Sequence, residues 1–285
     1  MSDGAGPRNE RPGLPLAVVV GAGGMGMAIA RRLGDSFRVL LADRDAAHLD
    51  RQLAHLRAEG HDARGVVCDV VDRDAVRALA AAADAAGPVR ALAHVVGLSP
   101  SMADAETILR VNLVGPTLVA DAFVHLATPG TAAVFIASLA GHTPVTPAEM
   151  AALDDPLADD FPAAVVAAIG ATITPARAYQ LSKAALIRMC ARRAASWGER
   201  GARIVSLSPG LIATPMGALE FAAQPEKHRL LPLTPLGREG TMVEIADAVD
   251  FLVSNRASFI TGTDLLVDGG IAAALRGDGD TGTGT

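Results

Sequence analysis

The chain has 285 residues, of which half are hydrophobic and 20% are charged, and its net charge at pH 7 is −6. This balance excludes a strongly basic nucleic-acid-binding protein and a chain too charged to collapse, while the length suffices for one or two domains with a buried core. Two cysteines, Cys68 and Cys190, are too few for a disulfide framework or a cysteine-rich zinc site. We therefore expect a cytoplasmic protein.

The two ends of the chain are polar and rich in glycine. We expect residues 1–15 to form a disordered arm and residues 276–285 a disordered tail, because neither contains enough apolar side chains to bury. We expect no secretory signal and no membrane span, because no segment combines about 20 apolar residues with a sequence that favours a helix.

Between these ends, short apolar segments alternate with alanine-rich segments of helical length. The predicted strands are Leu16–Val20, Arg38–Ala42, Gly65–Cys68, Ala91–Val96, Ala132–Ala137, Ile204–Leu207 and Thr263–Val267. The predicted helices are Met25–Leu33, Asp45–Glu59, Asp72–Ala86, Asp104–Leu126, Ala176–Trp197 and Met242–Ser254. This alternation predicts an α/β fold, with a doubly wound Rossmann-type parallel sheet of about seven strands and helices on both faces, in a single domain over residues 16–275.

Residues 142–175 interrupt this alternation. They contain five prolines, a cluster of four aspartates between residues 154 and 160, and the apolar run 161–169. The aspartates match no calcium-loop spacing, so we interpret them as a solvated surface. A structureless loop of this length is uncommon in a compact domain, and we expect the segment to contain a short helix of its own.

A glycine-rich loop follows the first predicted strand and opens the first predicted helix. Glycines permit a tight turn and a close approach to a pyrophosphate, and the helix then points its N-terminal amides at that anion. The motif is weak alone, but its place in the first βαβ unit predicts a dinucleotide site. The loop residues expected to bind the cofactor are Gly21, Gly23, Gly24, Met25 and Gly26.

Asp43 ends the second predicted strand, 22 positions after Gly21. A carboxylate at this place accepts the ribose hydroxyls of NAD and repels the 2′-phosphate of NADP. Arg44 follows and can pair with that phosphate, so the sequence favours NAD and leaves NADP open. Asp43 could instead cap the next helix, although Asp45 can fill that role.

The only tyrosine, Tyr179, lies four residues before Lys183, one of only two lysines in the chain. In a helix this spacing places both side chains on one face. A phenol is a poor base at neutral pH, and a nearby positive charge lowers its pKa. The chain uses arginine at nearly every other basic position, which indicates that a compact ammonium is needed here. A simple hydrogen bond on the helix surface is the alternative.

These features resemble the short-chain dehydrogenase/reductase family over residues 16–274. Tyr179 and Lys183 match its YxxxK motif, Ser138 begins a segment similar to its S-x-A-G motif, and Asn112 matches its helix asparagine. Residues 237–240, 259–262 and 267–270 are also similar to family segments. The resemblance implies that further cofactor contacts come from Asp69, Val70, Val95, Val96, Gly97, Pro209, Gly210, Ile212 and Thr214.

The resemblance implies NAD(P)-dependent hydride transfer between a nicotinamide and a secondary alcohol or ketone. Tyr179 would be the acid/base, Ser138 would bind the substrate oxygen, Lys183 would hold the nicotinamide ribose, and Asn112 would support a water chain. It also implies a homodimer or homotetramer, and we expect neither nucleic acid nor membrane as a partner. A non-catalytic NAD(P)-binding redox sensor is the alternative function.

Other enzyme classes find no support in the sequence. The seven histidines form no H-E-x-x-H pair, and no G-K-[ST] motif is present, so we expect no metal site and no P-loop nucleotide hydrolase. The expected substrate pocket is formed by residues 98–101, 139–142 and 216–231, which are mostly apolar. We therefore expect a hydrophobic substrate, with cyclic or steroid-like compounds as candidates.

The chain departs from the family in three places. Val20 stands where threonine is usual, in a loop one residue short. Residues 94–96 replace the usual Asn-Asn-Ala, and we interpret His94 as a hydrogen-bonded structural residue. Ser138 and Tyr179 are 41 positions apart, far more than is usual. The excess, residues 142–175, resembles an insertion of the 3-alpha-hydroxysteroid dehydrogenase/carbonyl reductase branch, and we expect a mainly helical excursion at the active-site mouth that changes substrate access and subunit contact.

Overall fold

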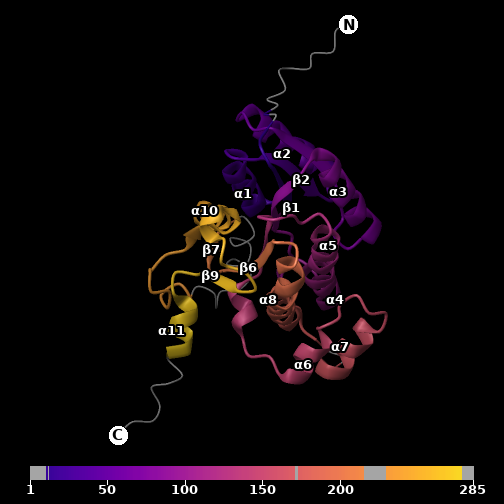
Figure 1. The fold of residues 1–285 in the computed structure, drawn as a ribbon. Helices are drawn as coiled ribbons and strands as arrows, with labels where there is room; N and C mark the ends of the chain where they lie inside the picture. The colour runs from indigo at the N-terminus through magenta and orange to yellow at the C-terminus, as the bar shows by residue number, and fades with distance from the viewer. Residues whose placement is uncertain (1–10, 12, 171–172, 215–228, 278–285) are drawn as a thin grey trace.

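A parallel sheet of seven strands forms the centre of the molecule, with strand order β3-β2-β1-β4-β5-β6-β9 (Figure 1). The computed structural model describes residues 11, 13–170, 173–214 and 229–277, so most of the expected arm and tail lies outside the described residues. The strands are β1 (Leu16–Val20), β2 (Arg38–Asp43), β3 (Ala63–Val67), β4 (Val89–His94), β5 (Ala132–Ile136), β6 (Arg203–Pro209) and β9 (Asp264–Val267). The predicted doubly wound fold is confirmed.

Helices cover both faces of this sheet. One face carries α1 (Gly24–Gly34), α2 (Ala46–Ala58) and α10 (Met242–Val253). The other carries α3 (Arg73–Ala86), α5 (Gly115–Val124) and α8 (Pro175–Gly198). A short pair of strands, β7 (Ile212–Ala213) and β8 (Gly240–Thr241), and the helix α11 (Ile271–Gly277) lie near the C-terminus.

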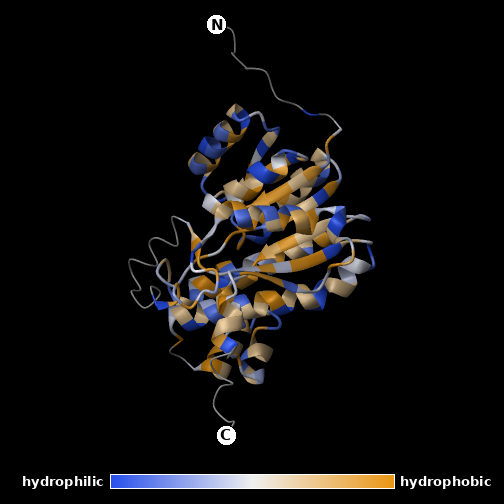
Figure 2. Ribbon diagram, turned by 90° about the vertical axis from the view of Figure 1, so that its left-hand side faces the viewer, coloured by the Kyte–Doolittle hydropathy of each residue, from blue (hydrophilic) through white to orange (hydrophobic). Residues whose placement is uncertain are grey.

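The sheet separates two hydrophobic cores, one on each face, which explains why its strands are continuous apolar segments. Successive residues of a strand point to opposite faces, so Val18 packs toward α3, α5 and α8, while Val19 packs toward α1, α2 and α10. All five residues of β1 are buried. Hydrophobic residues accordingly dominate the central strands, and hydrophilic residues lie mainly on the outer helices (Figure 2).

The helical stretch Ala105–Val124 is continuous through α4 (Ala105–Leu109), a π-helical turn (Arg110–Val114) and α5. By length and apolar composition it could cross a membrane, which the sequence analysis did not identify. In the fold, 61% of the qualifying window is buried, as is usual for a helix that contributes to a protein core.

The segment 142–175 contributes two helices, α6 (Pro147–Ala152) and α7 (Phe161–Ile169). Their apolar residues pack against α4 and α8, where Phe161 and Val165 join Ile108 and Leu181 in a buried cluster. The protein's own helices therefore cover part of the predicted apolar run, and Ala163, Val166 and Ala167 remain exposed.

Among the four aspartates interpreted as a solvated surface, Asp154 is the one that is partly buried, with 28% of its side chain exposed. Its carboxylate pairs with Arg188 and Arg192 of α8, at 2.8 Å in each case. These pairs link the segment between α6 and α7 to α8. Asp155, Asp159 and Asp160 are less buried, as expected for solvated carboxylates.

Candidate active site

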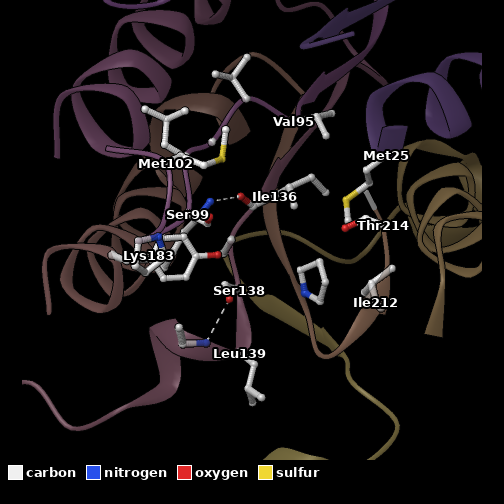
Figure 3. Close-up of a pocket in the computed structure, with 18 of the residues that line it drawn as sticks. Met25, Val95, Ser99, Met102, Ile136, Ser138, Leu139, Lys183, Ile212 and Thr214 are labelled. Carbon is white, nitrogen blue, oxygen red and sulfur yellow. Dashed lines mark hydrogen bonds between the residues drawn. The ribbon is translucent and has the colours of Figure 1, made fainter. Parts of the chain in front are cut away.

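A cavity of about 1100 Å³ opens where β1, β2, β4, β5 and β6 reach their carboxyl ends (Figure 3). The strand order reverses between β1 and β4, and ligands of open α/β sheets bind at such switch points. Every predicted cofactor residue lines this cavity, as do Ser138, Tyr179 and Lys183. Asn112 is the one predicted site residue that is absent from its wall.

Two glycines of the loop after β1 are required by the backbone geometry. Gly21 has a φ of +107°, and its N–H donates to the Ala42 carbonyl over 2.7 Å. A Cβ atom on Gly26 would lie 1.9 Å from the Gly21 oxygen, so any side chain there would push the loop away from α1. Gly23 is the N-cap of α1 and has open space beside it. Its missing side chain leaves the helix N-terminus accessible to an anion.

Asp43 has a second role that the sequence did not reveal. Its carboxylate accepts the Ala22 N–H over 2.8 Å and the Asp45 N–H over 3.0 Å. His48 Nε2 lies 3.0 Å from the Ala22 carbonyl, which makes this nitrogen the donor. Asp45, and not Asp43, caps α2 through the His48 N–H. Asp43 and His48 therefore hold the N–H and the carbonyl of the same loop residue, Ala22.

Asn112 supports the cavity from behind. It lies in the π-helical turn, and its side chain accepts the Leu98 N–H over 2.7 Å and donates to the Leu98 carbonyl over 2.9 Å. Turns of this kind are frequent at functional sites. A Cβ atom on Gly97 would lie 3.3 Å from Lys183 Nζ and 3.5 Å from Asn112 Oδ1. Glycine therefore lets the chain pass between these two polar groups.

Lys183 is almost fully buried, with 4% of its surface exposed. Its Nζ donates to the Ile136 carbonyl over 2.9 Å and lies 5.8 Å from the centre of the Tyr179 ring. Burial lowers the pKa of Lys183 to about 8. The predicted helix and the shared helix face of the two residues are confirmed, and Thr174 caps that helix by accepting the Arg177 N–H.

Ser138 lies at the end of β5 and begins a short 3-10 turn, Leu139–His142. Its Oγ accepts the Ala140 N–H over 3.2 Å (Figure 3), which leaves the hydroxyl hydrogen able to donate to a ligand. A Cβ atom on Gly141 would lie 2.8 Å from the Lys183 carbonyl carbon. The glycine therefore allows the turn to approach α8.

His142, at the end of this turn, lines the cavity, as expected for the predicted pocket segment 139–142, but its hydrogen-bond partner was not predicted. Its Nε2 lies 2.9 Å from Asp264 Oδ2 on β9, and Ser206 donates to the other oxygen of that carboxylate over 2.6 Å. These hydrogen bonds connect the turn after Ser138 to β9, the edge strand of the sheet. Only the fold brings together residues so distant in sequence.

His94 does not have the hydrogen bonds that the sequence analysis expected. Its ring is 1% exposed and stacks on Phe135, with ring centres 5.4 Å apart. Neither ring nitrogen has a hydrogen-bond partner among the described residues. Burial, helped by the charge of Lys183, lowers the pKa of His94 to about 3.

This buried histidine predicts a pH-dependent stability. An unfolded histidine protonates near pH 6.5 whereas the folded His94 stays neutral to about pH 3, so the free energy of unfolding should fall as the pH drops between those values. The expected slope is about 1.4 kcal/mol per pH unit. Urea unfolding of the wild type and of His94→Leu between pH 4 and 6 measures it. In His94→Leu the free energy of unfolding should no longer show the pH dependence that one proton contributes, while the exposed His125→Leu should retain it. Parallel slopes for the wild type and His94→Leu would contradict the assignment.

The substrate side of the cavity agrees in part with the expected segments. Residues 98–101 line it, as do Leu139, Ala140, His142 and Leu230, whereas residues 216–228 lie outside the described residues. The other lining residues on this side are Met102, Thr143, Pro144, Ala176, Gln180, Ala272, Leu275 and Arg276. In the part of the chain that the structure describes, no three His, Cys, Asp or Glu side chains cluster as metal ligands.

Comparison with known proteins places this geometry in context. Residues 15–150 match the family described as short chain dehydrogenase, and residues 163–272 match the family described as enoyl-(acyl carrier protein) reductase. The galactitol 2-dehydrogenase (L-tagatose-forming) of Cereibacter sphaeroides is 35% identical over 266 residues, which cover 89% of this chain and 93% of that protein. The 3-alpha-hydroxysteroid dehydrogenase/carbonyl reductase of Comamonas testosteroni is 31% identical over 248 residues, which cover 78% and 91%. A crystal structure of an actinorhodin polyketide ketoreductase variant with NADPH is 26% identical, with a TM-score of 0.73, and the match covers 91% of this chain and 97% of that one.

Proposed function

The chain belongs to the short-chain dehydrogenase/reductase family, and on this premise we propose that it interconverts a ketone and a secondary alcohol with Tyr179 as the acid/base. One observation carries the proposal. The glycine loop, Ser138, Tyr179 and Lys183 come from distant parts of the sequence and line one cavity. A redox sensor would need only the first of these features.

The residues present fit a nicotinamide dinucleotide. The glycine loop approaches α1 so closely that a side chain on Gly26 would block it, which leaves backbone amides to face a pyrophosphate. Asp69 and Val70 would contact the adenine, Lys183 the nicotinamide ribose, and Ile212 and Thr214 the carboxamide. When bound, the nicotinamide gives or accepts the hydride, and the protein supplies position and electrostatics.

Three side chains would act on the substrate oxygen and its proton. Tyr179 would donate or accept that proton, and the Lys183 ammonium, 5.8 Å from the centre of its ring, would favour the phenolate. Because the pKa of Lys183 is about 8, the ammonium form predominates at neutral pH even though the side chain is buried. Ser138 would donate its free hydroxyl hydrogen to the same oxygen as negative charge develops there. Asn112 would hold the Leu98 loop and support a water chain beside Lys183.

We further propose NAD as the preferred cofactor, and Asp43→Asn tests it. The substitution removes the charge that repels a 2′-phosphate but keeps an oxygen that can accept the Ala22 N–H. The ratio of the NADPH to the NADH dissociation constant should fall by about 10-fold, a shift of ~1.4 kcal/mol. Fluorescence titration of both cofactors measures it, with the exposed Asp84→Asn as the control. Tighter binding of NADPH than of NADH by the wild type would show that Arg44 outweighs Asp43.

The substrate is proposed to be hydrophobic. The cavity wall beyond Tyr179 presents Leu98, Met102, Leu139 and Leu275, among other apolar side chains. The two curated relatives act, by their names, on a sugar alcohol and on a hydroxysteroid, and the apolar wall favours the second kind of compound. Turnover of a diverse panel of carbonyl compounds with NADH and NADPH, and of alcohols with NAD, tests the activity. Tight cofactor binding with no turnover across this panel would favour the redox sensor instead.

We propose that α6 and α7 modify the subunit contact in the manner of the hydroxysteroid dehydrogenase/carbonyl reductase branch. These helices cover α4 and α8, and the corresponding helices often form a four-helix contact between subunits in the family. Replacing residues 153–172 with a short Gly-Ser linker should change the oligomeric state or the KM and leave cofactor affinity intact. Light scattering and steady-state kinetics measure these properties. If neither changed, the segment would be only a surface excursion.

A further inference from the structure

The helix α8 presents four residues to the cavity, at positions i, i+3, i+4 and i+7: Ala176, Tyr179, Gln180 and Lys183. This spacing forms one continuous stripe along a helix. Tyr179 and Lys183 have proposed roles in the reaction, and Ala176 contributes only a methyl group. Gln180 is the polar residue of the stripe that the mechanism does not use.

The orientation of the Gln180 amide is determined by its neighbour. Arg177 Nη1 lies 3.2 Å from Gln180 Oε1. A guanidinium only donates hydrogen bonds, so the atom that faces it must be the amide oxygen and not the nitrogen. The NH₂ group is therefore the part of the side chain left for the cavity. In the described part of the chain, no hydrogen bond from Gln180 Nε2 to another residue is present.

Arg177 is itself held firmly by the segment between Ser138 and Tyr179. Its Nε and Nη2 donate to the Glu149 carboxylate of α6 over 2.7 to 3.2 Å, and its Nη1 also donates to the Pro144 carbonyl over 3.1 Å. Glu149 in turn closes a capping box with Thr146 and is only 12% exposed. A bidentate pair of this kind fixes both partners geometrically. The segment therefore determines how Gln180 faces the cavity.

Other polar side chains on this wall are already engaged. Ser99 and Ser101 bond to each other over 3.0 Å, Thr143 donates to the Ala140 carbonyl, and His142 bonds to Asp264. Arg276 is exposed on the terminal helix α11, at the rim. Gln180 differs from these residues because its free donor lies directly beside Tyr179 on the same helix.

We propose that Gln180 is a substrate-binding residue whose amide NH₂ donates a hydrogen bond to a second oxygen of the substrate, and that Arg177 and Glu149 are its positioning residues. The proposal rests on the proposed ketone–alcohol activity and narrows its substrate class. The substrate is an otherwise apolar carbonyl compound with a keto, hydroxyl or ester oxygen near the reacting carbonyl. A bound compound without that oxygen would exclude water from the partly buried donor and leave it unpaired, which disfavours it.

The test compares cyclohexanone with cyclohexane-1,2-dione and cyclohexane-1,4-dione at saturating NADH. For the wild type, kcat/KM per carbonyl should be about 10-fold higher for at least one dione than for cyclohexanone, as expected for one hydrogen bond to an otherwise unpaired donor. Gln180→Met has nearly the same shape but no donor, and it should lower this ratio by about 10-fold relative to the wild type. The same substitution at Gln52, on α2 and outside the cavity wall, should keep the wild-type ratio.

Glu149→Gln tests the positioning role. It removes the charge that holds Arg177, so it should raise the KM for the preferred dione with a smaller effect on kcat. The double variant Glu149→Gln/Gln180→Met should discriminate no worse than Gln180→Met alone, because both changes act on the same hydrogen bond. A merely structural role of Glu149 would instead give additive losses on all three ketones.

The outcomes separate this inference from the proposed activity. A wild-type ratio near one for both diones, or an unchanged ratio in Gln180→Met, would overturn the role of Gln180 and leave the activity intact. If the wild type reduced none of the three ketones, the activity itself would be in question. In that case, calorimetry gives the dissociation constants of the three compounds for the NADH complex. The ratio of the constant for cyclohexanone to that for each dione is then judged by the same criteria.

Discussion

Tyr179→Phe should lower kcat by at least about 100-fold while the dissociation constant for NADH changes little, because general acid–base catalysis contributes about 10²–10⁴-fold. The substitution keeps the aromatic ring and removes the only phenol in the chain. Packing around α8 should therefore be preserved, and the loss should fall on proton transfer. Steady-state kinetics with a substrate found in the carbonyl panel, together with NADH titration, measure the two quantities.

The control for this variant is its own thermal unfolding, compared with that of the wild type. An unfolding midpoint equal to that of the wild type would show that the loss of activity has no structural cause. Retention of near wild-type kcat would remove Tyr179 from the mechanism. Equal losses in kcat and in NADH affinity would point to a role in cofactor binding instead.

Lys183→Arg should be damaging although it preserves the positive charge. Lys183 is 4% exposed, and its Nζ lies 2.9 Å from the Ile136 carbonyl and would lie 3.3 Å from a Cβ atom on Gly97. A planar guanidinium cannot occupy this point-like position. We expect kcat to fall by about 100-fold or more and the NADH dissociation constant to rise by about 10-fold.

Lys183→Met separates the charge from the shape of the side chain. It keeps an unbranched side chain at this buried position and removes the ammonium. Both variants should therefore lose activity, but Lys183→Met should fold at least as stably as Lys183→Arg. Calorimetric unfolding and NADH titration of both variants test this. Near wild-type turnover by Lys183→Arg would mean that only the charge is required, and that the close packing around Nζ has no role in catalysis.

The sequence was sufficient for the main elements of the fold and for most of the cavity wall. Aliphatic runs with helices between them predicted the seven parallel strands, since a strand covered on both faces must be apolar on both. The glycines, Asp43, Ser138 and the Tyr179–Lys183 pair were found because local chemistry constrains them. A tight turn needs Gly21, and a helical spacing of four brings a lysine beside a tyrosine, whatever the rest of the chain does.

What the tertiary structure alone decided are the partners of polar groups that meet across the fold. Asp43 binds the glycine loop, Asp154 is held by two arginines of α8, and His94 is buried without the hydrogen bonds expected for it. Arg177 aligns Gln180 because α6 places Glu149 against it. A sequence determines which side chains can be buried, since burial follows apolar periodicity along the chain. Which donor meets which acceptor depends on how segments distant in the sequence pack together, and no local sequence pattern determines that packing.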